Sequence, residues 1–109
     1  MRMQQRDAIE AYTILILLDR ENEPLQTIDI KFELERNFID SPKMPNPHTL
    51  AASFRRSGYF ISEKGNKSNL RRYKISPEIY EKLQPHIPEL FQLASSPKNL
   101  SEKIRKYLS

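Results

Sequence analysis

The chain has 109 residues, of which 38% are hydrophobic and 29% are charged, and its formal net charge is +4. This length supports one domain with a single modest core, and the composition argues against a disordered or membrane-embedded chain. The longest apolar run, residues 14–18, is far too short to cross a bilayer. Cysteine is absent, which excludes disulfides and thiolate chemistry and fits a cytoplasmic protein.

Charge is distributed unevenly along the chain. Within the first 40 residues five basic residues face nine acids, whereas residues 55–74 contain seven basic residues and one acid. A surface that needs only solubility usually mixes both signs. The basic segment therefore predicts a face that attracts a polyanion, and a merely solvated basic hairpin is the alternative.

The first predicted element is a helix over about residues 4–18. Its apolar residues recur at helical spacing, and the dense ILILL end indicates burial on most sides. The following polar stretch ends this helix, because Pro24 disfavours a helical conformation at Glu23.

The stretch from Leu25 to Phe38 fits two patterns, since its apolar residues alternate as in a strand and also form a helical stripe. Thr27 is a suitable N-cap, and the residues after it are mostly good helix formers. We therefore expect a short extended segment at Leu25–Gln26 and a helix from about Ile28 to Phe38.

Three prolines within residues 39–48 predict a loop before the next helix. Asn46 can cap that helix, which has Pro47 at its first position, where a missing N–H costs little. The helix PHTLAASFRRS then ends at Gly58, a residue that tolerates the left-handed conformation common after a helix.

Two short strand-like runs, YFIS and LRRYKIS, flank a loop that contains Gly65 and Asn66, so a β-hairpin is predicted. We expect Tyr73 and Ile75 to pack inward. Tyr59 and Ile61 would then lie opposite them, with Arg72 and Lys74 on the open face and Arg71 near the loop.

The rest of the chain is predicted to be helical in three pieces, the first with Ser76 as cap and Pro77 at its first position. The last piece has an apolar stripe of Leu100, Ile104 and Leu108. This stripe can pack back onto the core of the same chain or form a contact with a second copy.

This order of elements resembles a winged helix-turn-helix domain over roughly residues 5–84. The stretch HTLAASFRRSGYFISEKGNKSNLRRYKISPE is similar to a recognition helix and a wing that ends on the tyrosine–leucine–threonine stretch of many bacterial and archaeal regulators. The resemblance implies a mainly α-helical α+β fold in a single domain, residues 1–109, with a helical extension over residues 85–109. The loop before the recognition helix is longer than the tight turn that is usual in the family.

The third helix has two different faces. Leu50 and Phe54 share one face and would dock the helix on the core. The opposite face is small at its centre and carries hydrogen-bond donors on both flanks, as insertion into a DNA major groove requires. An arginine near the helix C-terminus can grip a phosphate or a guanine, and we favour phosphate there. Base contacts would then fall first to His48, Thr49 and Ala52, with Ser53 on the flank.

The hairpin would supply a second contact, because a cationic loop with a glycine can follow a DNA backbone or enter a minor groove. The candidate DNA-binding residues of both elements are His48, Thr49, Ala52, Ser53, Arg55, Arg56, Lys64, Lys67, Asn69, Arg71, Arg72 and Lys74.

We therefore expect a small transcriptional regulator that binds double-stranded DNA, by sequence or by shape, on the nucleoid. Pairing through the N-terminal or C-terminal helices would make it a homodimer that presents two recognition helices. The alternative is a winged-helix interaction module within a larger complex, with Phe60 as its exposed anchor. The hypothesis of RNA binding has less support, because the sequence shows no platform of stacked aromatic residues on the predicted sheet.

Catalysis, metals and cofactors are not expected. His48 and His86 are the only histidines, and they lack the spacing of a zinc site. The carboxylate pairs within residues 7–10 and 33–35 lie among basic residues and fit ion pairs on helix surfaces. Gly58 and Gly65 stand alone, so no glycine-rich phosphate loop exists.

Overall fold

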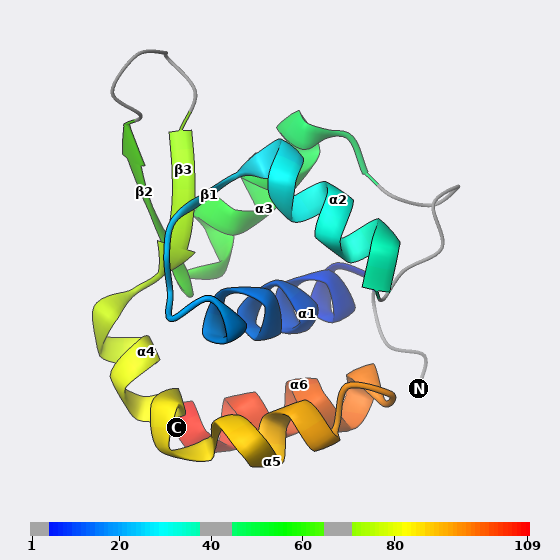
Figure 1. Cartoon of the computed structure of the whole chain (residues 1–109), viewed down its shortest axis with the longest axis vertical. Helices are drawn as coiled ribbons and strands as arrows, with labels where there is room; N and C mark the ends of the chain where they lie inside the picture. The colour runs from blue at the N-terminus through cyan, green and yellow to red at the C-terminus, as the bar shows by residue number, and fades with distance from the viewer. Residues whose placement is uncertain (1–4, 38–44, 65–70) are drawn as a thin grey trace.

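The computed structural model of the chain describes residues 5–37, 45–64 and 71–109 (Figure 1). Helix α1 lies across the middle of the molecule, with α2, α3 and the hairpin on one side and α5 and α6 on the other. The elements are α1 (Gln5–Asp19), β1 (Leu25–Gln26), α2 (Thr27–Asn37), α3 (Pro47–Ser57), β2 (Phe60–Lys64), β3 (Arg71–Ile75), α4 (Pro77–Leu83), η2 (Gln84–His86), α5 (Ile87–Gln92) and α6 (Pro97–Leu108).

The fold is mainly α-helical with a three-stranded antiparallel sheet in the order β1-β3-β2, which confirms the predicted α+β class. This arrangement is winged-helix-like. The extended segment Leu25–Gln26 is present, and it joins the sheet by pairing with Tyr73 and Arg72 of β3. The sequence predicted the segment but not its partner. Pro42 of the predicted loop and the predicted hairpin tip lie outside the described residues.

Helix α1 is the centre of the core. Residues 11–18 are all buried, because α2 and α3 cover one side of the helix while α5 and α6 cover the other. The one polar residue in this run, Thr13, donates a hydrogen bond of 2.7 Å from its hydroxyl to the carbonyl of Ile9. Burying each large aliphatic side chain stabilises the fold by about 1.5–3 kcal/mol, so α1 contributes much of the hydrophobic stabilisation.

The apolar stripe of α6 packs back onto the core of the same chain. Leu100 and Ile104 are fully buried, and Leu108 is partly buried. The guanidinium of Arg105 forms an ion pair of 3.3 Å with Asp7 of α1. Of the two interpretations that the sequence left open for this stripe, the structure confirms the intramolecular one.

Both ends of α3 follow the local signals of the sequence. The side chain of Asn46 accepts a hydrogen bond of 2.9 Å from the backbone N–H of Thr49, and Pro47 occupies the first turn. Gly58 ends the helix with a φ of 79°. Helix α4 also has the predicted N-cap residue, Ser76, and a proline in its first turn, but the Ser76 side chain makes no capping hydrogen bond.

The hairpin differs from the prediction by one residue on its first strand. Phe60 lies opposite Ile75, so Phe60 faces inward and is 7% exposed, whereas Ile61 lies opposite Lys74 and is 41% exposed. A shift of one residue moves every side chain of a strand to the other face. The expectation that Tyr59 and Ile61 lie opposite Tyr73 and Ile75 is therefore wrong. Tyr59 precedes the strand and packs, partly buried, against the core.

The turn after α1 fastens the hairpin to the core. Asn22 has a φ of 61°, and its side chain bonds the backbone of Ile75 twice. The amide nitrogen donates to the Ile75 carbonyl at 2.8 Å, and the amide oxygen accepts from the Ile75 N–H at 2.7 Å. Because Ile75 is fully buried, these groups have no access to water in exchange.

Replacing Asn22 with glycine keeps the positive φ but removes both hydrogen bonds. We expect the free energy of unfolding, measured in urea, to fall by about 2 kcal/mol, because two buried backbone groups lose their partner. Glu21, with a φ of 55°, offers the matched control, and Glu21→Gly should change stability by less than about 1 kcal/mol. Equal stability of the two variants would contradict the role given to Asn22.

Candidate nucleic-acid interface

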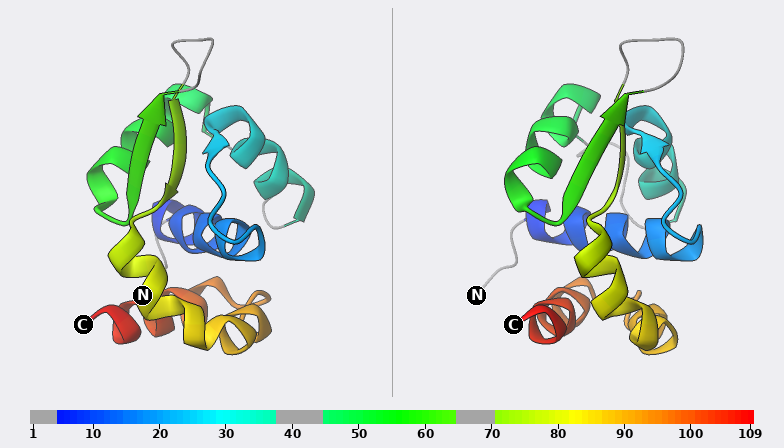
Figure 2. Two further views of the ribbon diagram at one scale, coloured as in Figure 1. Left: turned by 60° about the vertical axis from the view of Figure 1, so that its left-hand side comes forward. Right: turned by 90° about the vertical axis from the view of Figure 1, so that its left-hand side faces the viewer.

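Helix α3 and the hairpin lie side by side, as both views in Figure 2 show. The ring of Phe54 on α3 packs against Phe60 of β2 at a centroid distance of 5.0 Å and against Tyr73 of β3 at 5.4 Å. All three residues are buried. The nucleic-acid hypothesis requires this adjacency, because one duplex can meet the cations of both elements only if they share a face.

A groove separates the outer side of α3 from the hairpin. It has a volume of about 290 Å³, and we call it the wing groove. Arg55 enters it from α3 and Arg71 from β3, so the structure brings these two predicted residues together. The guanidinium of Arg55 lies 3.5 Å from the hydroxyl of Tyr73, within hydrogen-bond distance. The groove is lined by Gln26, Thr27, Ile28, Pro47, His48, Ala51, Arg55, Arg71 and Tyr73.

The cations of the hairpin divide between its two faces. Arg71 lies opposite Lys64 at the end of the strands next to the loop, and it donates a hydrogen bond of 3.1 Å to the hydroxyl of Ser62. These residues share the strand face of Tyr73, which is turned toward α3. Arg72 and Lys74 alternate onto the opposite face, where Arg72 lies 3.8 Å from Glu63. The predicted residues Lys67 and Asn69 lie outside the described residues.

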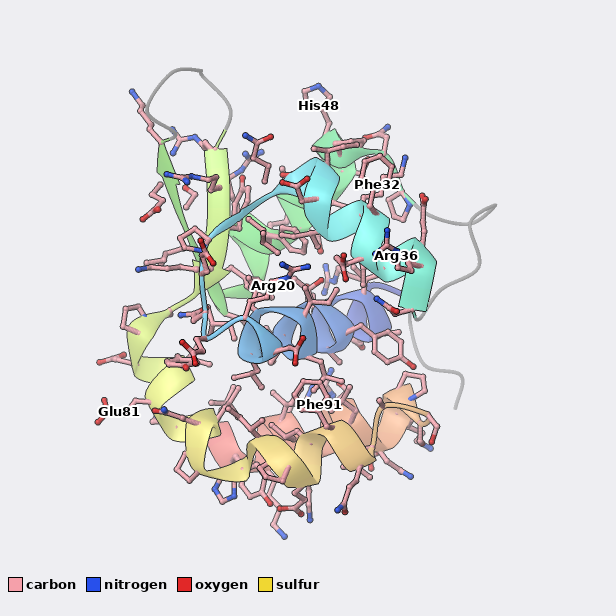
Figure 3. All side chains as sticks on the ribbon, viewed as in Figure 1. Arg20, Phe32, Arg36, His48, Glu81 and Phe91 are labelled. Carbon is pink, nitrogen blue, oxygen red and sulfur yellow. The ribbon has the colours of Figure 1, made fainter. Side chains whose placement is uncertain are left out.

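The predicted base-reading residues lie at the start and the middle of α3. His48 and Thr49 are exposed, and Figure 3 shows His48 projecting from the end of the molecule. Ala52 is partly buried and leaves the helix surface shallow at its centre. Short side chains there allow the helix backbone to approach a base edge closely.

A second groove runs along the other side of α3, facing α1. We call it the α1 groove; its volume is about 420 Å³, and Arg6 and Arg56 reach it from the two helices. Sequence reasoning missed Arg6 because it lies in the acid-rich part of the chain. The groove is lined by Arg6, Ile9, Pro45, His48, Thr49, Leu50, Ala52, Ser53 and Arg56.

Ser53, predicted on the flank of the DNA-facing surface, points toward α1. Its hydroxyl donates a hydrogen bond of 3.3 Å to the carboxylate of Glu10, which is 7% exposed. Burial raises the pKa of the Glu10 carboxyl, while the Ser53 hydrogen bond and the charge of Arg6 act in the opposite direction. The contact fixes α3 against α1.

The structure removes the exposed anchor on which the interaction-module alternative depended. Phe60 is buried against Phe54 and cannot reach a partner. Large apolar residues are instead exposed on α2, where Ile28 is 38% and Phe32 57% exposed, and on β2 at Ile61. Exposure of Phe32 was not predicted from the sequence, because the buried stripe of Ile30 and Leu34 already accounted for the helix.

Two other kinds of site are absent from residues 5–37, 45–64 and 71–109. No cluster of three or more histidine, aspartate or glutamate side chains there is arranged to hold a metal ion. None of the helices in these ranges has the length and apolar character that a membrane span requires.

Neither a protein-family model nor a curated protein matches the chain. The chain is similar to the crystal structure of a conserved protein of unknown function that is described as a potential transcriptional factor. The TM-score is 0.52, the sequences are 22% identical, and the match covers 99% of this chain and 97% of that chain. At this identity the likeness shows the fold alone, including the helices after the hairpin.

Proposed function

We propose that the chain binds double-stranded DNA with α3 and the hairpin and acts as a transcriptional regulator on the nucleoid. The main support for this proposal is the wing groove, which is lined by Arg55 from α3 and by Arg71 from β3. A helix in the major groove lies beside a phosphate backbone, and cations on its flank meet that backbone. This role makes the chain a binding protein and not an enzyme.

The roles divide along the helix. Arg55 and Arg71 would hold phosphates and set the register of the protein on the duplex. His48 and Thr49 carry donors at the start of α3, the part of a recognition helix that contacts base edges in related geometries. The described potential role of the structural neighbour in transcription agrees with this proposal.

A protein-binding role for the same face has less support. An interface needs a buried anchor at its centre, usually an aromatic or arginine side chain in a pocket. The outer face of α3 offers His48, Thr49 and Ala52 with flanking arginines, and Phe60 is not available. We therefore prefer DNA to an acidic protein partner for the surface formed by α3 and the hairpin.

Replacing Arg55 and Arg71 together with alanine should weaken binding to duplexes of any sequence. The loss of two phosphate contacts should also flatten the plot of log affinity against log salt by about two units. Fluorescence anisotropy between ~50 and ~200 mM salt measures both effects. Lys98→Ala removes one exposed charge from α6 and is the control, expected to match the parent. If the double variant and the parent give the same affinity and slope, the phosphate role of the wing groove is refuted.

The homodimer expected from the sequence needs a different surface, because the apolar faces of α1 and α6 are buried within the chain. We propose α2 as that surface. Phe32 is 57% exposed there, and Figure 3 shows it on the same helix as Arg36. Asp29 and Arg36 are seven residues, or two turns, apart, with Phe32 between them, and all three line one surface hollow. An antiparallel pair of α2 helices would place Arg36 beside Asp29 of the partner subunit, as a self-complementary interface requires.

Replacing Phe32 with serine should convert a dimer to a monomer, measured as mass by light scattering. Arg36→Asp should do the same, because it sets two acids against each other, and adding Asp29→Arg should restore pairing. Thermal melting checks the fold, since the exchanged charges oppose the helix dipole by up to about 1 kcal/mol each. If the parent protein is monomeric at high concentration, pairing through α2 is contradicted. The protein would then bind DNA as a monomer.

A further inference from the structure

We propose that the α1 groove is a phosphate-binding site formed by Arg6 and Arg56, and that in a DNA complex it holds the backbone strand on the side of α3 away from the hairpin. This inference rests on the proposed function for the source of the phosphate. It assigns a DNA contact to α1, a helix that otherwise belongs to the core.

The wing groove and the α1 groove lie on two different sides of α3. Adjacent residues of an α-helix point about 100° apart, so Arg55 and Arg56 point to different sides of α3. Arg55 lines the wing groove, whereas Arg56 lines the α1 groove. His48 lines both grooves and therefore lies on the surface of α3 between them.

This arrangement matches the dimensions of a duplex. The major groove of B-DNA is about 12 Å wide, and an α-helix with its side chains is about 10–12 Å across. A helix that fills the groove therefore has one phosphate backbone along each side. With cations on only one side, α3 would meet one strand; with Arg6 and Arg56 on the other side, it meets both.

The chemistry of the α1 groove suits a phosphate. Its wall toward the core is apolar at Ile9 and Leu50, which lowers the local dielectric and strengthens charge–charge attraction. Thr49 adds a hydroxyl to the two arginines. The side chain of Arg6 is 56% exposed and only loosely held, with its Nε 3.8 Å from a carboxylate oxygen of Glu10, so it can turn toward an incoming anion.

Glu10 opposes anion binding because its carboxylate already contacts Arg6, one of the two arginines of the site. Its carboxylate contacts Arg6 and Ser53, and the charges of Asp7 and Arg105 also act on it. Burial raises the pKa of this carboxyl, so the negative charge costs more here than on the surface. Removing it should free Arg6 and strengthen phosphate binding, whereas a Glu10 that only supports the fold would not produce tighter binding when replaced.

Four variants test this site: Arg6→Ala, Arg56→Ala, Arg6→Lys and Glu10→Gln. Their affinity for a DNA duplex is measured by fluorescence anisotropy at several salt concentrations. Each alanine variant should lose roughly threefold to tenfold in affinity at ~50 mM salt and about 0.9 units of salt slope. Arg6→Lys should keep most of the slope because it keeps the charge, and Glu10→Gln should bind more tightly than the parent. Lys98→Ala is the control for loss of a remote charge, and thermal melting identifies variants that fail to fold.

The outcomes separate this inference from the proposed function. In one outcome, the double variant of Arg55 and Arg71 weakens duplex binding while the Arg6 and Arg56 variants bind as the parent does. The α1 groove is then not a DNA contact, so the inference is overturned while the proposed function stands. If the parent binds no duplex at ~50 mM salt, the proposed function fails, and inorganic phosphate becomes the probe.

In that case NMR tests whether the α1 groove binds phosphate at all. Inorganic phosphate, compared with chloride at equal ionic strength, should shift the backbone amides of Thr49 and Ser53 in the parent and not in Arg6→Ala. Such a shift would support a site for a small phosphate-bearing molecule in place of DNA. Without it, the α1 groove binds no phosphate and the inference is overturned.

Discussion

The position of α3 depends on the burial of one ring. Phe54 is completely buried, and its ring contacts Phe60 and Tyr73 from the two strands of the hairpin. Aromatic pairs at these distances stabilise a structure by about 0.5–1.5 kcal/mol each beyond the area they bury. The cluster therefore does more than fill the core, because it fixes the distance between the arginines of α3 and those of β3.

The other supports of the hairpin act on the same strand. Asn22 bonds Ile75 at the end of β3, and β1 pairs with Tyr73 and Arg72 farther along it. Since β3 is the central strand, its neighbours satisfy its backbone along both edges. A hairpin of two strands alone is marginally stable in water, and these additional contacts allow it to hold a fixed orientation to α3.

Features that depend on nearby residues were predictable from the sequence, and features that depend on tertiary packing were not. Asn46 and Gly58 set the ends of α3 through local backbone chemistry, so both were correctly identified. The hairpin register was missed because an aromatic or apolar residue stands at several consecutive positions, and only the ring of Phe54 decides that Phe60 faces inward. The contribution of Arg6 was hidden for the same reason, since it requires α1 to lie against α3.

The uneven charge of the chain has a structural explanation. Acids of the first 40 residues neutralise cations on the helices and in the turn after α1, as in the pairs of Asp7 with Arg105 and Glu33 with Arg20. Among the described residues, by contrast, Arg55, Arg56 and Arg71 have no acidic partner within 4.0 Å. Arg55 and Arg71 line the same groove, so their like charges repel one another in the free protein. A polyanion relieves this repulsion when it binds, so the separation of charge within the fold favours a phosphate backbone over a neutral partner.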